Sequence, residues 1–282
     1  MNKLLVILGM LIISLQAVGA ADIQGHVKVV QPVSGTFYEG GVVDLGVVGP
    51  GQRIEIEIAR SSNIYNFKNE EEVWDKLYID VQSLPRNWIW DDSLRYEANP
   101  KALVIVDKDT PDGEYEFGLY TERDYNTAAK YPVHFKAKVA VTKDVLMLSV
   151  KTKSVKGGVN QPSEFVVYLE NKGSANDAFD LELASGLPGK WAFKKQVFIP
   201  HNSPKILQYE VVASDPGTFS NMKFRATSLS SETIFAEDDA ELIAASDLVT
   251  DMKSVGNGVI LFPYVEQPIY YLLGFIANNF FS

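Results

Sequence analysis

The chain has 282 residues, of which 46% are apolar and 11% aromatic, and this composition supports about two globular domains with well-packed cores. The formal net charge is −10 and no run of Lys or Arg is longer than two residues, which argues against binding to nucleic acid. There is no cysteine, so disulfides, thiolate metal sites and cysteine nucleophiles are excluded.

The amino-terminal segment 1–21 has the pattern of an export signal. Lys3 provides a positive start, an apolar stretch runs from Leu4 to Val18, and Ala20 closes the small-residue pattern that signal peptidase reads. We therefore expect an exported protein, located at the extracellular face of the cell membrane or in the cell envelope. The apolar stretch is close to the lower length limit for crossing a bilayer, so an uncleaved signal anchor is the alternative.

Residues 22–143 and 144–244 show the period-two alternation of half-buried β-strands. Arg53 to Ile58 alternates Arg or Glu with Ile, and Leu77 to Val81 alternates in a similar way. Turn signals rich in Gly, Pro, Asn and Asp separate such segments. The acidic segment from Asn69 to Asp75 is the one helical candidate in this region. The pattern predicts an all-β protein with two tandem immunoglobulin-like β-sandwiches.

A Leu-Pro unit followed by Trp occurs once in each half of this region. Leu84 and a proline precede Trp88 in the first half, and Leu187 and a proline precede Trp191 in the second. Similar strands and a turn ending in Gly follow each unit. We expect Trp88 and Trp191 to occupy equivalent buried positions in two sandwiches of one type, with the two leucines as core neighbours.

Three segments of the second half, Glu164–Gly173, Gly186–Trp191 and Met222–Ser228, carry a family resemblance. The first half shares it more weakly, through Val47–Gly51 and the unit ending at Trp88. On these residues the chain resembles the immunoglobulin-like module found beside some bacterial α-galactosidases and repeated in many prokaryotic, especially archaeal, surface and membrane-associated proteins. The resemblance implies the fold and a surface setting. It implies no catalytic residues, because that family has none in common.

The turn that begins at Asp107 groups three carboxylates with a glycine, as calcium loops do. The carboxylates belong to Asp107, Asp109 and Asp112, and Gly113 follows them. An EF-hand loop needs its third Asp at position five and its glycine at position six, and here both come one place later. We interpret the segment as a solvated turn, with a weak divalent-cation site as the alternative.

A second candidate site combines aromatic and acidic side chains. Trp90 is followed by Asp91 and Asp92, and such a group can stack on a sugar ring while the carboxylates accept hydrogen bonds from its hydroxyls. Ordinary packing of Trp90 is the competing interpretation.

The sequence offers no catalytic constellation. No two of the three histidines, His26, His134 and His201, stand at metal-ligand spacing. The chain also lacks a Gly-rich phosphate loop and a nucleophile elbow. We expect neither enzymatic activity nor a cofactor.

The carboxyl-terminal segment 245–282 departs from the strand pattern. Pro263, Glu266 and Pro268 interrupt its apolar run and argue against a continuous membrane-spanning helix. We expect the remaining apolar and aromatic side to dock on the membrane surface. Packing against a sandwich or a partner protein, and true spanning, are the alternatives. The residues concerned are Ile269, Tyr270, Tyr271, Leu272, Leu273, Phe275, Ile276, Phe280 and Phe281.

These features together predict a non-catalytic extracytoplasmic surface protein that acts as a structural or protein-binding component at the membrane. A carbohydrate-binding accessory module is the alternative. The expected partners are the membrane surface or a protein bound through the tail, with other surface proteins or an envelope polymer also possible.

Overall fold

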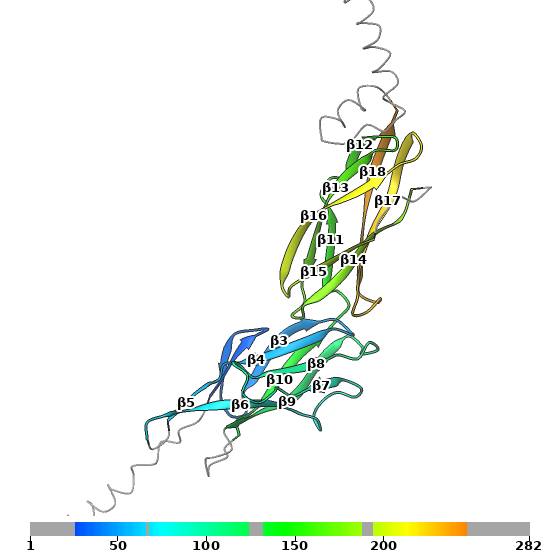
Figure 1. The fold of residues 1–282 in the computed structure, drawn as a ribbon. Helices are drawn as coiled ribbons and strands as arrows, with labels where there is room; N and C mark the ends of the chain where they lie inside the picture. Colours follow the sequence, from blue (N-terminus) through cyan, green and yellow to red (C-terminus); the bar gives the residue numbers. More distant parts are fainter. Residues whose placement is uncertain (1–25, 66–67, 124–131, 188–193, 247–282) are drawn as a thin grey trace, which may run out of the picture.

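The computed structural model describes residues 26–65, 68–123, 132–187 and 194–246 (Figure 1). Every regular element in these ranges is a β-strand, and the strands form two sandwiches placed end to end. The predicted all-β fold with two tandem immunoglobulin-like sandwiches is therefore confirmed. None of the described segments is a helix that could cross a membrane.

The first sandwich comprises two five-stranded sheets. One sheet has the order β2 (Gly35–Phe37), β1 (Val27–Gln31), β4 (Arg53–Ile58), β8 (Lys101–Ile105) and β7 (Ile89–Asp91). The other has the order β3 (Val42–Val48), β10 (His134–Val141), β9 (Gly113–Arg123), β6 (Glu71–Asp80) and β5 (Ser61–Tyr65).

The second sandwich packs a three-stranded sheet against a five-stranded one. The smaller sheet has the order β11 (Leu146–Val150), β13 (Pro162–Asn171) and β16 (Ser203–Val212). The larger has the order β12 (Ser154–Gly158), β18 (Phe235–Ala245), β17 (Gly217–Ser228), β14 (Asp177–Ser185) and β15 (Lys195–Ile199).

The two sandwiches share most of their strand plan but differ in one edge strand. In both, the last strand pairs in parallel with an early strand, as β10 does with β3 and β18 with β12. The strand that follows the Leu-Pro…Trp unit differs between the two. In the first sandwich this strand, β7, pairs with β8. In the second, β15 pairs with β14, which belongs to the sheet that contains the parallel strand pair. In the first sandwich the edge beside β6 is taken instead by β5.

The helix considered for Asn69 to Asp75 is wrong, because Glu71 to Asp80 forms strand β6. The register of β6 against β9 shifts between Trp74 and Lys76, so Trp74 and Asp75 are both buried before the alternation resumes. This bulge interrupts the period-two pattern of the sequence. Burial of the whole Trp74 side chain then favours the strand over any local helical preference.

Alternating apolar side chains from the facing sheets fill a separate core in each sandwich. Trp88 belongs to the first core, is 4% exposed, and donates from Nε1 to Thr110 Oγ1 at 3.0 Å. Leu84 packs partly buried against this core, and Leu187 is buried in the second one. Trp191 lies outside the described residues, so its equivalence to Trp88 stays a prediction.

Trp88 and Trp90 form a matched pair for a stability test, because both follow the same turn but only Trp88 is buried. Trp88→Ala removes core contacts and leaves a cavity, and should cost about 3–5 kcal/mol of unfolding free energy. Trp90→Ala should cost less than about 1 kcal/mol. Urea denaturation followed by circular dichroism measures both, and equal losses would contradict the assigned core.

Candidate functional site

A buried polar cluster joins the two sandwiches. Asp177, which is 5% exposed, accepts hydrogen bonds at Oδ2 from Gln52 Nε2 at 2.7 Å and from Ser228 Oγ at 2.6 Å. Its Oδ1 accepts from Ser230 Oγ at 2.9 Å and from the N–H of Ala178 at 2.8 Å. Four donors thus satisfy a carboxylate that has been removed from water, as a buried charge requires.

Gln52 extends this cluster into the first sandwich. It is fully buried, and its Oε1 accepts from the N–H of Gly49 at 2.7 Å while its Nε2 donates to Asp177. A main-chain hydrogen bond from Ser174 N–H to Val47 O, 2.7 Å long, crosses the same joint. The connection therefore combines side-chain and backbone bonds from both sandwiches.

Glycines in the β3–β4 connection allow the sandwiches to approach closely. A Cβ on Gly49 would lie 2.3 Å from Ile234 Cδ1, and one on Gly51 would lie 2.6 Å from the carbonyl oxygen of Ser230. Gly51 also has a φ of +81°, which favours glycine. Ala175, which precedes β14, is buried in the first core, so each sandwich contributes to packing at the joint.

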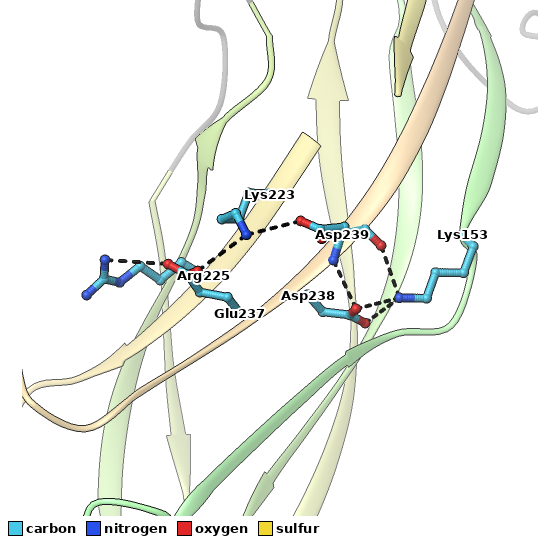
Figure 2. A network of polar contacts seen from close by, with 6 residues as sticks. All are labelled: Lys153, Lys223, Arg225, Glu237, Asp238 and Asp239. Atoms are coloured by element: carbon cyan, nitrogen blue, oxygen red, sulfur yellow. Dashed lines mark hydrogen bonds and ion pairs between the residues drawn. The ribbon is translucent and has the colours of Figure 1, made fainter. Parts of the chain in front are cut away.

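A second polar network lies in the second sandwich, centred on β17 and β18 of the larger sheet (Figure 2). Asp238 accepts hydrogen bonds from Lys153 Nζ at 2.6 Å and from the N–H of Val150 at 2.7 Å. These contacts hold the connection at which the chain leaves β11 for β12. Directly opposite residues on β17 and β18 add the ion pairs Lys223–Asp239 (3.4 Å) and Arg225–Glu237 (3.6 Å). The network is therefore best explained as structural.

The acidic turn between β8 and β9 is a structural connection. The N–H of Thr110 donates to Asp107 O at 3.1 Å, and Thr142 Oγ1 donates to Asp112 Oδ2 at 3.4 Å. Asp109 is exposed. Across the described ranges, no three His, Cys, Asp or Glu side chains are grouped so that they could hold a metal ion.

The proposed sugar platform at Trp90 is divided between the two sheets. Trp90 and Asp91 are exposed on edge strand β7, which pairs only with β8. Asp92 instead turns toward β6 and accepts the N–H of Ile79 at Oδ1, 3.0 Å away. Asp92 thus satisfies a backbone donor of the opposite sheet, and the sugar site at Trp90 stays a prediction.

The tail residues 247–282, including the aromatic side expected to dock on a membrane, lie outside the described residues, as does the expected signal at 1–21. Their predicted roles therefore stay predictions.

A row of aromatic rings crosses the outer face of the sheet β3-β10-β9-β6-β5. Tyr78 on β6 lies opposite Tyr120 on β9, and Tyr120 lies opposite His134 on β10. The Tyr78 and Tyr120 rings stack with centroids 4.9 Å apart, and the Tyr120 and His134 rings stack at 5.5 Å. The Lys76 ammonium lies over the Tyr78 ring, 4.2 Å from its centroid. All these side chains belong to the polar face of their strands, which accounts for the row.

A hollow of about 380 Å³ lies beside this row. Tyr120, Glu122, Arg123 and His134 contribute to its wall, together with Tyr78, Thr121 and Pro132. Glu122 is fixed there, since its Oε2 accepts from Tyr78 Oη at 2.5 Å and pairs with Arg95 Nη2 at 3.4 Å. Burial and the hydrogen bond to Glu122 raise the pKa of Tyr78. Burial, followed by the negative charges of Asp92, Asp80 and Glu122, raises that of Tyr120.

Neither the joint nor the aromatic row follows from the sequence alone. Gln52 and Asp177 are 125 residues apart and belong to no motif. Tyr78 and Tyr120 do show a signal, because each occupies an outward position in an alternating strand. Only the register of β6 against β9 shows that the two rings meet.

No protein-family model matches the chain, and no curated protein matches its sequence. Solved structures similar to it include the fibronectin(III)-like modules of CbhA from Clostridium thermocellum, at 12% identity and a TM-score of 0.27, covering 78% of this chain and 94% of that one. The D00-D0 domain of intimin matches at 12% identity and a TM-score of 0.26, and the match covers 78% of this chain and 100% of that one. A chimeric titin Z1Z2 functionalized with an exogenous decorin peptide matches at 12% identity and a TM-score of 0.35. This match covers 79% of this chain and 99% of that one. At these values the matches carry no inference about function.

Asp238 provides a pH test of the second network. Burial alone would raise its pKa, but hydrogen bonds from Lys153, Val150 and Asp239 outweigh burial and hold the pKa below the ordinary value of 3.8. A carboxyl whose pKa is lowered by folding stabilises the folded state above its unfolded pKa, and this contribution is lost as the pH falls through the folded pKa.

Asp238→Asn should therefore lower the unfolding free energy at neutral pH by about 1 kcal/mol. The difference in unfolding free energy between this variant and the unaltered protein should shrink as the pH falls below about 4. Urea titrations at a series of pH values measure this, with Asp239→Asn, a change in the more exposed neighbour, as the control. A difference that does not vary with pH would show that Asp238 contributes through packing alone.

Proposed function

We propose that this protein is a non-catalytic surface component outside the cytoplasm, in which two rigidly joined sandwiches hold a binding surface away from the membrane. The observation that carries the proposal is the buried joint centred on Asp177 and Gln52. A freely hinged pair of domains needs no buried carboxylate between them. Breaking this joint would exchange the hydrogen bond between Gln52 and Asp177 for bonds to water, at a net cost of about 1.5–3 kcal/mol for a bond to a charged group.

The direction of the chain supports this arrangement. Strand β10 runs from His134 to Val141, and Val141 lies next to the joint because Thr142 N–H donates to Val48 O. The aromatic row, which begins at His134, is therefore at the opposite end of the first sandwich. Strand β18 ends at Ala245, at the end of the second sandwich far from the first (Figure 1). A tail anchored at the membrane would thus place the aromatic row outermost.

The carbohydrate-binding alternative has less support, because the group that motivated it is not assembled. Asp92 is bonded to β6, so of the three residues only Trp90 and Asp91 lie on the exposed strand β7.

Rigidity of the joint tests the structural part of the proposal. The chain has no cysteine, so Lys136→Cys and Lys156→Cys introduce one spin-label site in each sandwich. Electron–electron double resonance measures the distance between the two spin labels. In the otherwise unaltered protein it should give one narrow distribution of that distance. Asp177→Ala removes the acceptor for Gln52, Ser228 and Ser230, and should broaden that distribution.

Asp180→Ala is the matched control, since Asp180 lies on the same strand but pairs with Lys194 away from the joint. It should leave the distance distribution narrow. A broad distribution before any change at Asp177 would contradict a rigid support.

Membrane attachment is a separate part of the proposal. Deleting residues 259–282 removes the aromatic tail, and the expected result is loss of flotation with liposomes by a protein that otherwise floats. If the full and shortened chains both stay unbound, the tail is not a membrane anchor and its apolar side must pack against protein.

A further inference from the structure

We propose that the groove between the two sandwiches binds a neutral sugar unit of a glycan, with the Phe198 ring as its stacking surface. This inference rests on the proposed function as a binding component and deepens it by naming the class of ligand. The groove has a volume of about 290 Å³ and shares no residue with the site predicted at Trp90, which lies on β7. Its lining combines an exposed aromatic ring with hydrogen-bonding groups from both sandwiches.

Each sandwich supplies one wall of the groove. Arg53 and Glu55 belong to β4 of the first sandwich, whereas Phe198 on β15 and His201 after it belong to the second. Ser174 lies where the two walls meet, since its N–H donates to Val47 O at 2.7 Å across the joint. The walls therefore come together only when the sandwiches are docked. Ligand sites are found preferentially at such interfaces between domains.

The polar groups of the second wall are held in one orientation. Asn176 Oδ1 accepts the N–H of His201 at 2.9 Å and lies 3.0 Å from His201 Nδ1. A main-chain N–H can only donate, so the amide oxygen faces His201 and the Nδ2 group is left as a donor. Because Oδ1 is an acceptor, Nδ1 of the neutral ring carries the proton and Nε2 is an acceptor. Within the described ranges neither Asn176 Nδ2 nor His201 Nε2 has a hydrogen-bond partner, so this wall offers both a donor and an acceptor.

The first wall carries charges that cancel. Arg53 Nη2 pairs with Glu55 Oε1 at 3.1 Å, and both residues line the groove. Lys101 on the neighbouring strand β8 lies 3.8 Å from Glu55 and 3.5 Å from Glu57, so the charges along this pair of strands are balanced as well. Neither an anion nor a cation finds a net counter-charge here. A neutral ligand can still use the pair, because the guanidinium group donates hydrogen bonds and the carboxylate accepts them.

Phe198 gives the groove an open aromatic face. Its side chain is 57% exposed, and among the described residues no other ring stacks on it. Its backbone is fixed, because its C=O accepts from Lys205 Nζ at 3.1 Å. A sugar presents hydroxyls that both donate and accept, together with an apolar ring face that packs on an aromatic ring. Phe198 and the polar groups of the two walls match both features in one groove.

An extended peptide fits this groove less well. Adding a strand to a sheet edge requires free main-chain groups on the edge strand. On β15 the C=O of Phe198 is taken by Lys205, and Pro200, which follows the strand, has no N–H to donate. Binding here therefore depends on side chains, which suits a sugar better than a peptide backbone.

The test uses the full chain with 13C-labelled His rings, because His201 is one of only three histidines. The neutral probes are cellotetraose, mannotetraose and N-acetylated chitotetraose. We expect at least one of them to shift the His201 ring signal saturably while the His26 and His134 signals stay unchanged. Absence of saturation with all three would overturn the proposal. So would equal saturation by the uncharged peptide acetyl-Ser-Gly-Ser-Gly amide, or tighter binding of the acidic probe tetragalacturonate.

Phe198→Ala should weaken binding of the oligosaccharide about tenfold, because it removes the stacking surface, whereas Phe198→Tyr keeps the ring and should retain binding. Phe235→Ala is the matched control, because Phe235 is also exposed but lies on β18 outside the groove. Equal affinities of the Phe198→Ala variant and the unaltered protein would contradict the assigned role of the ring.

Spin-label distances across the joint separate this proposal from the proposed function. A narrow distance distribution without oligosaccharide binding would refute the sugar site alone. A broad distribution in the otherwise unaltered protein would refute the rigid support, so the two failures are distinguishable.

Discussion

The hydrogen bonds at Asp177 determine how the two sandwiches can act together. A carboxylate removed from water is stable only when donors surround it, and here one donor comes from Gln52 of the first sandwich while the others come from the second. Its protein environment is complete only when the sandwiches are docked. Separation of the sandwiches would exchange the Gln52–Asp177 hydrogen bond for bonds to water and expose the packed joint, so the docked placement is favoured.

Most of the longer strands follow from the sequence because buried and exposed side chains alternate along them. Arg53 to Ile58 alternates without a break and is β4, and Leu77 lies inside β6 as expected. The same rule fails at Asn69 to Asp75, where a bulge at Trp74 places two consecutive side chains inward. Local periodicity cannot reveal a bulge whose cause is pairing with a distant strand.

The sites were less accessible from sequence, because each depends on contacts between distant segments. Val47–Gly51 carries part of the family resemblance, and the glycines of the same segment allow the second sandwich to approach. Trp90 and Asp92 are close in sequence but serve opposite sheets, so a local motif was misleading there. Tyr120 and His134 are separated by the β9–β10 connection and meet only through strand register.

The difference between the two edge strands links the fold to the aromatic row. In the second sandwich β15 covers the edge of β14, whereas in the first β7 joins the other sheet and the β5–β6 hairpin takes that edge. The amino-terminal part of β6, before Lys76, forms this hairpin with β5. Glu72 in this part pairs with Arg123 at the end of β9. Arg123 is thereby held in the wall of the hollow, next to Glu122. The structural change that distinguishes the first sandwich from the second therefore also shapes the hollow beside the aromatic row.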